Sequence, residues 1–91
     1  MITLTNLSHA LALRKYKNFR RAAAAENLSQ PAFSRSIQKL EERLSVKLFE
    51  RHYGSVTATL YGESLLHRAE NIFTEPHEME REIQILNYEN N

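Results

Sequence analysis

The segment from Phe19 to Arg51 limits the possible folds most, because its apolar residues repeat with the period of a helix. They recur at intervals of four, three and four, which places them on one side of a helix. This stripe consists of Phe33, Ile37, Leu40 and Leu44. At about 100° per residue, the opposite side is small, polar and charged. It carries Pro31, Arg35, Gln38 and Glu42. The sequence therefore predicts a helix with an apolar back and a polar front.

The beginning of this helix is marked by Ser29 and Pro31. A serine hydroxyl can cap a helix N-terminus, and proline is tolerated in the first turn. Before them, residues 22–25 are four alanines, which favour a helix and allow two backbones to approach closely. Two helices joined by so short a link form a helix-turn-helix. A second helix with this polar and basic front fits the major groove of DNA.

Short elements are expected on both sides of this helix pair. Thr5 or Asn6 is expected to cap a first helix that ends near Tyr16. Strands are expected at 48–51 and 56–58, with a turn over 53–55 that contains Gly54. Such a hairpin would be the wing of a winged helix-turn-helix.

A long last helix is expected to begin after Thr59. Its apolar residues follow one another at alternating steps of four and three, which is a heptad pattern. The stripe contains Leu65, Ala69, Ile72, Pro76, Met79, Ile83 and Leu86. Residues 60–88 would span about 43 Å, more than one small domain can cover, so a partner helix is expected. The alternative is that the stripe folds back on its own domain. Pro76 should kink the helix.

Charge is distributed unevenly along the 91 residues. Residues 1–59 contain ten Lys or Arg and four Glu, a net charge of +6, whereas residues 60–91 contain two Arg and seven Glu, a net charge of −5. A polyanionic partner is therefore expected for the first part only.

Several functional classes are excluded by composition. The chain has no cysteine, no apolar run that could span a bilayer and no visible signal peptide, so we expect a cytoplasmic protein. His67 and Glu70 have a metal-ligand spacing, but Arg68 and the heptad stripe crowd them. With only two glycines there is no phosphate-binding loop. We therefore expect no metal, no cofactor and no enzymatic activity.

The combined spacing of these residues resembles the N-terminal signature of the LysR-type bacterial transcriptional regulators, over about residues 2–88. The matching residues are Ala22, Ala23, Leu28, Ser29, Gln30, Pro31, Ala32, Ser34, Ile37, Leu40, Glu41, Leu44, Leu48, Phe49, Arg51, Val56, Thr59 and Gly62. The resemblance implies a mainly α fold: a winged helix-turn-helix of three helices and a two-stranded wing at 1–59, with the helix-turn-helix at 19–38. A dimerisation linker helix would follow at 60–91 and pair two copies into a homodimer.

The resemblance also implies roles for individual residues. Base contacts in the major groove would come from Gln30, Pro31, Ala32, Arg35 and Gln38. Phosphate contacts would come from Asn18, Arg21, Ser29, Ser34, Lys39, Arg51 and His52. Dimer contacts would come from Leu65, Ala69, Ile72, Met79, Ile83 and Leu86.

Four positions depart from the pattern of the family. Ala10 stands where a large aromatic residue is usual, Glu26 where an apolar residue is usual, Ser45 where glycine is usual and Gly54 where a basic residue is common. The family continues into a larger effector-binding domain, so the chain is expected to be a fragment or a truncated regulator. Any effector small molecule would bind that domain.

The function implied is sequence-specific binding of double-stranded DNA by a dimer, on a pseudo-palindromic operator, for the regulation of bacterial transcription. The alternative is a helical protein-interaction module that dimerises through the heptad helix and never binds DNA. The basic first part argues against that alternative.

Overall fold

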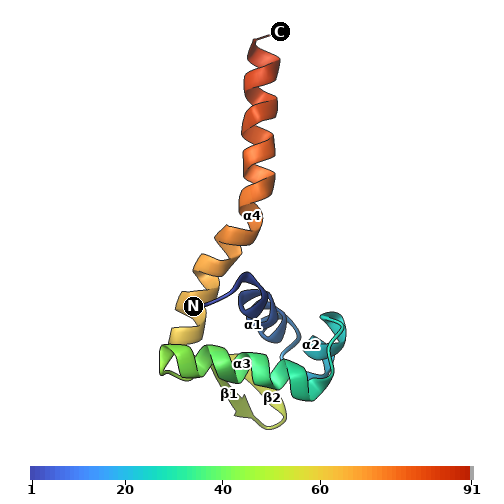
Figure 1. Ribbon diagram of the computed structural model, residues 1–91, viewed down its shortest axis with the longest axis vertical. Coiled ribbons are helices and arrows are strands. Elements are labelled where there is room, and N and C mark those ends of the chain that lie inside the picture. The colour runs from blue at the N-terminus through green and yellow to red at the C-terminus, as the bar shows by residue number, and fades with distance from the viewer. Residues whose placement is uncertain (91) are drawn as a thin grey trace.

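The computed structural model describes residues 1–90, which form four α-helices and one β-hairpin (Figure 1). In chain order the elements are α1 (Leu4–Tyr16), α2 (Phe19–Ala25), α3 (Gln30–Leu44), β1 (Phe49–His52), β2 (Ser55–Ala58) and α4 (Leu60–Glu89). The expected winged helix-turn-helix followed by a long helix is confirmed.

The core lies between α1, α2, α3, the hairpin and the first turns of α4. Its largest fully buried side chains come from different elements, so burying them joins these elements. They are Leu13, Phe33, Leu40, Leu48 and Leu66. Ala10 is fully buried, so this position is filled by a methyl group packed inside the domain.

The helix ends follow local capping chemistry. α1 begins two or three residues earlier than expected, because Thr3 and not Thr5 or Asn6 is its N-cap. The Thr3 hydroxyl accepts from the amide of Asn6, and the Asn6 side chain accepts from Thr3 in return, which is a capping box. Asn18 caps α2, and Ser29 caps α3 as expected. Ser45 ends α3 with a left-handed φ of 58°, the conformation for which glycine is usually preferred.

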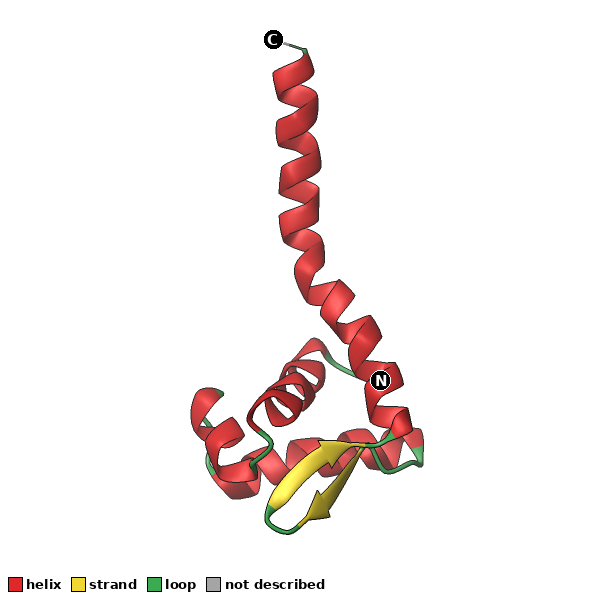
Figure 2. Ribbon diagram, turned by 180° about the vertical axis from the view of Figure 1, so that it is seen from behind, coloured by secondary structure: helices red, strands yellow, loops and turns green. Residues whose placement is uncertain are grey.

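The hairpin is an antiparallel pair with Arg51 opposite Val56 and His52 opposite Ser55. Both strands are one residue closer to the turn than expected, so the loop contains only Tyr53 and Gly54. Both loop residues have positive φ, 49° and 82°, which suits the twist of a two-residue hairpin. The two strands lie beside α3 at one end of the molecule (Figure 2).

α4 has an inner part that belongs to the domain and an outer part that projects from it (Figure 1). The inner part packs on α1 and β2, and it buries Gly62, Leu66 and Ala69. All residues from 70 to 90 are exposed. The helix continues through Pro76 and bends near its middle, as expected from the missing amide N–H and the bulk of the ring.

This packing corrects the role expected for one residue of the dimer stripe. Ala69 is 1% exposed and faces its own domain, so it has no surface to offer a partner. Leu65 is partly buried against the same core. The stripe is therefore divided: its first two positions face the domain, and from Ile72 onward its residues face solvent. Of the helices described, none is long and apolar enough to cross a membrane.

Candidate nucleic-acid interface

The exposed side of α3 is formed by the residues that the helix period placed opposite the core. Phe33 and Ile37 are 0% and 3% exposed, whereas Arg35 and Gln38 are exposed. We call this exposed side, made of Pro31, Arg35, Gln38 and Glu42, the front of α3. The predicted orientation of the helix is therefore confirmed. All four residues of the front are exposed, so no element described covers it.

All five residues expected to contact bases lie within the first turns of α3, and all are exposed. They are Gln30, Pro31, Ala32, Arg35 and Gln38. Arginine and glutamine can each form two hydrogen bonds with the edge of one base, and small apolar groups can contact a thymine methyl. Exposed side chains of these types on one helix suit a duplex groove.

The back of α3 is held against α1 by polar contacts as well as by the core. The Ser36 hydroxyl accepts from the side-chain Nδ2 of Asn6 at 3.0 Å and lies 2.6 Å from Nδ1 of the buried His9. Because Ser36 lies next to the buried stripe, these bonds oppose rotation of the helix about its axis. A fixed rotation keeps the front directed outward.

The other flank of α3 is tied to the hairpin by Glu41. Its Oε2 accepts from the amides of Leu48 and Phe49 at 2.7 and 3.4 Å. No role beyond the family pattern was expected for Glu41. Glu41 lies seven positions before Leu48, across the end of α3, so no local pattern indicates the bond.

The residues expected to contact phosphates come from α2, α3 and β1 and from the caps of the two helices. Arg21, Ser29, Lys39, Arg51 and His52 are exposed, and Asn18 and Ser34 are partly buried. Asn18 uses its side-chain oxygen to cap α2, accepting from the amide of Arg21 at 2.8 Å, so its side-chain N–H groups are left to donate. The Ser29 hydroxyl accepts from Ala32 as the cap of α3.

The two basic residues of β1 have different surroundings. Strand alternation places Phe49 and Arg51 on one face and Glu50 and His52 on the other. Nε2 of His52 lies 3.4 Å from a carboxylate oxygen of Glu50. That carboxylate would repel a phosphate, so Arg51 is the better candidate of the two.

Positive charge near the front is not neutralised by the protein. Within residues 1–90, ion pairs involve Arg14, Lys47, His52 and Arg81. Arg21, Arg35, Lys39 and Arg51 form none in this range. Arginines and lysines without a carboxylate partner are available to bind an external anion.

A pocket of about 320 Å³ lies where α2, α3 and the hairpin meet. It brings in Gly54, which was not among the expected contact residues. Its lining consists of Asn18, Phe19, Arg20, Gln30, Arg51, Gly54 and Val56. Two arginines and two side-chain amides around one hollow favour an anionic group.

A family model described as "Bacterial regulatory helix-turn-helix protein, lysR family" matches residues 4–63. The SDS degradation transcriptional activation protein of Pseudomonas sp. is 44% identical over 72 residues, which are 79% of this chain and 24% of that protein. The hydrogen peroxide-inducible genes activator of Haemophilus influenzae is 39% identical over 74 residues, which are 81% of this chain and 25% of that protein. The chain thus spans about a quarter of the length of these relatives.

Solved structures agree with the fold. The BenM DNA-binding domain in complex with catB site 1 DNA superposes with a TM-score of 0.80 and 28% identity, over 93% of this chain and 94% of that one. Full-length OxyR C199D from Pseudomonas aeruginosa superposes with a TM-score of 0.77 and 32% identity, over 93% of this chain and 29% of that one.

Proposed function

Because this chain belongs to the lysR family of bacterial regulatory helix-turn-helix proteins, we propose that it binds double-stranded DNA and regulates transcription in a bacterial cytoplasm. The relatives with stated roles are transcriptional regulators, and several structural neighbours, the BenM DNA-binding domain among them, were solved as DNA complexes. The proposed role is binding and not catalysis. It requires no cofactor.

The observation that supports the proposal most directly is the front of α3. It is exposed, and the nearby Arg21, Lys39 and Arg51 have no ion-pair partner among the described residues. Base contacts are proposed for Gln30, Pro31, Ala32, Arg35 and Gln38. Phosphate contacts are proposed for Asn18, Arg21, Ser29, Ser34, Lys39 and Arg51, and with less support for His52.

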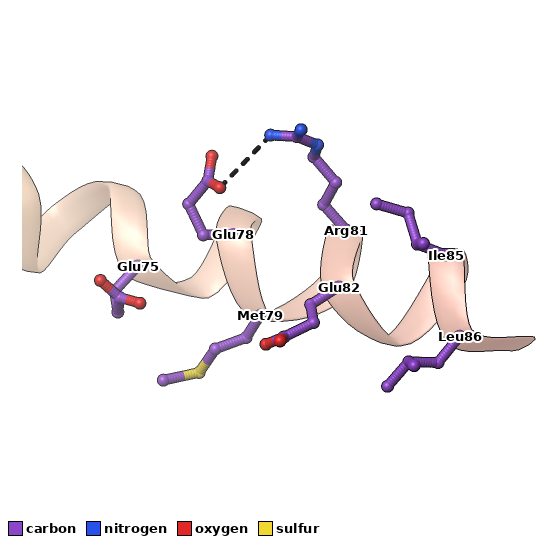
Figure 3. Close-up of a pocket in the computed structure, with 7 residues that line it drawn as sticks. All are labelled: Glu75, Glu78, Met79, Arg81, Glu82, Ile85 and Leu86. Carbon is purple, nitrogen blue, oxygen red and sulfur yellow. Dashed lines mark hydrogen bonds and ion pairs between the residues drawn. The ribbon is translucent and has the colours of Figure 1, made fainter.

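A homodimer is the proposed binding unit, on an operator with two related half-sites. The outer part of α4 exposes large apolar side chains along one stripe, and an exposed apolar patch of this kind marks an interaction site in a protein. The proposed contacts are Ile72, Met79, Ile83 and Leu86, with Leu65 at the margin. Figure 3 shows Met79 and Leu86 leaving the helix on one side, while Arg81 and Glu78 approach each other on the opposite side.

Two substitutions test the DNA contacts. Duplexes selected from a random pool would serve as the ligand, and binding would be measured at several salt concentrations. Arg35→Ala should lose about 1–3 kcal/mol of DNA-binding free energy and relax the sequence preference at one base pair. Arg21→Ala should weaken all sequences alike and reduce the slope of log affinity against log salt by about one.

The alternative, a protein-interaction module, predicts a different result. In that case both variants would dimerise normally and no duplex would be enriched from the pool. A control is Arg81→Ala, on the outer part of α4, which should leave both affinity and salt dependence unchanged.

A further inference from the structure

The guanidinium of Arg51 lies over the ring of Phe19, with the central carbon 4.4 Å from the ring centroid. Phe19 in turn meets Phe33 edge to face, with centroids 6.1 Å apart and ring planes at 81°. Phe33 is fully buried in the back of α3. A cation of the hairpin is thus connected through two rings to the helix that carries the front.

The position of Arg51 along the hairpin makes this contact possible. Arg51 pairs with Val56, and the amide of Val56 donates to the carbonyl of Lys17 at 3.0 Å, just before α2. Paired residues of an antiparallel ladder point to the same face. Since Val56 is buried, Arg51 points to the helix side of the hairpin. The Arg51–Val56 pair is therefore attached twice to the junction of α1 and α2: Arg51 contacts Phe19, and Val56 bonds to Lys17.

The ring holds the guanidinium without neutralising its charge. A cation over an aromatic face is attracted electrostatically. The face of the planar group is used by the ring, and its N–H edges remain available to bind a phosphate. No carboxylate of residues 1–90 forms an ion pair with Arg51.

We propose that Phe19 is a positioning residue for Arg51: its ring orients the guanidinium before binding, so that Arg51 receives a backbone phosphate at the pocket between α2, α3 and the hairpin. This inference rests on the proposed DNA binding. An unrestrained arginine would lose its rotamer freedom on binding, and the stack removes part of that cost in advance. Phe19 itself need not touch the DNA.

The stack can be tested without DNA by NMR on the full chain. In the parent protein, protons of the Arg51 side chain should be shifted upfield by the ring. Phe19→Leu should abolish the shift, and Phe19→Tyr should preserve it. A parent spectrum in which Arg51 resembles a solvent-exposed arginine would overturn the proposal.

The effect on binding can be tested by a double-mutant cycle with a selected duplex. Phe19→Leu should weaken binding about 3- to 10-fold in the parent, and by less than about 1.5-fold when Arg51 is already alanine. Arg51→Lys keeps the charge and can still lie over the ring, but it loses the planar face, so the loss caused by Phe19→Leu should be smaller there than in the parent. The control cycle pairs Phe19→Leu with Arg35→Ala, and its two effects should multiply.

Equal weakening by Phe19→Leu in the parent and the Arg51→Ala protein would show that Phe19 acts through the fold alone, and the proposal would fail. The folded fraction of every variant is measured by circular dichroism. If Phe19→Leu is partly unfolded, Phe19→Met replaces it in the same cycle. Absence of binding by the parent to any duplex would sink the proposed function, whereas additive cycles with normal parent binding would sink only the role of Phe19.

Discussion

Gly62, in the first turn of α4, leaves no room for a side chain against the backbone of Leu48. A Cβ at this position would lie 2.2 Å from the Leu48 carbonyl oxygen. The same carbonyl accepts from the amide of Thr59, and the Thr59 hydroxyl donates to the carbonyl of Lys47 at 2.6 Å. The start of α4 is therefore held against the segment before β1 by backbone atoms that cannot rotate away.

We expect Gly62→Ala to lower the free energy of unfolding by about 1–3 kcal/mol, because the methyl group forces backbone to move. Urea denaturation followed by circular dichroism measures the change. Ser64→Ala, two residues later on an exposed position of the same helix, is the control and should change stability by less than about 0.5 kcal/mol. Equal stability of the Gly62→Ala and parent proteins would contradict the close contact.

The sequence allowed the exposure of some residues to be predicted, but not the contacts between residues that are distant in the chain. The exposure of Arg35 and Gln38 could be predicted because both follow from the helix period around Phe33 and Ile37. The stack of Arg51 on Phe19 could not, since 32 positions separate the two residues and only the folded hairpin brings them together. Glu26 was an apparent misfit, yet its carboxylate accepts from the Ser8 hydroxyl at 2.6 Å and so joins α2 to α1.

At the scale of elements, α3 and the hairpin are joined through Glu41, whose side chain is 13% exposed. The amides of Leu48 and Phe49 both donate to one of its carboxylate oxygens. Because β1 starts at Phe49, this carboxylate fixes where the hairpin begins relative to the front of α3.

Glu41→Ala should therefore lower the free energy of unfolding by about 1.5–3 kcal/mol, the cost of removing a charged acceptor from buried amides. Glu41→Gln retains an acceptor and should cost less. Glu42→Ala is the matched control, because the neighbouring Glu42 is exposed on the front. Thermal unfolding of the three variants gives the comparison, and similar losses for Glu41→Ala and Glu42→Ala would contradict the role of Glu41.

Element types and order followed from the sequence, but some boundaries did not. The four-residue strands end one position later or begin one earlier than expected, because backbone pairing and not side-chain pattern decides where a short ladder stops. Ala69 was assigned to a partner because it fits the heptad stripe. An alanine in such a stripe can equally well be buried within its own domain, and the pattern alone does not separate the two.

At the scale of the whole molecule, α4 begins directly after the basic part of the chain, residues 1–59, and extends through the acidic part. Its inner part is fixed to α1 by the core and by Arg14, which pairs with both Glu63 and Glu70. These pairs are partly exposed, so the buried Leu66 and Ala69 are expected to contribute more to the attachment. Beyond residue 70 nothing in the described chain covers the helix, and the molecule extends to 56 Å along its longest axis.

The outer part of α4 should therefore control assembly independently of folding. Ile83 is 65% exposed, so Ile83→Glu should leave the thermal stability of the monomer nearly unchanged. In a dimer, the same change would bury an unpaired charge, which costs roughly 3 kcal/mol and weakens association by about two orders of magnitude. Gln84→Glu adds the same charge at the next, off-stripe position and is the control. Analytical ultracentrifugation over a concentration series should give a monomer for Ile83→Glu and a dimer for the parent and Gln84→Glu.

On DNA, Ile83→Glu should retain weak binding to a single half-site and lose the gain from a second one, because two domains that are no longer joined bind independently. A parent chain that stays monomeric throughout, or an Ile83→Glu protein that sediments as a dimer, would show that the stripe beyond Ile72 does not form the dimer contact.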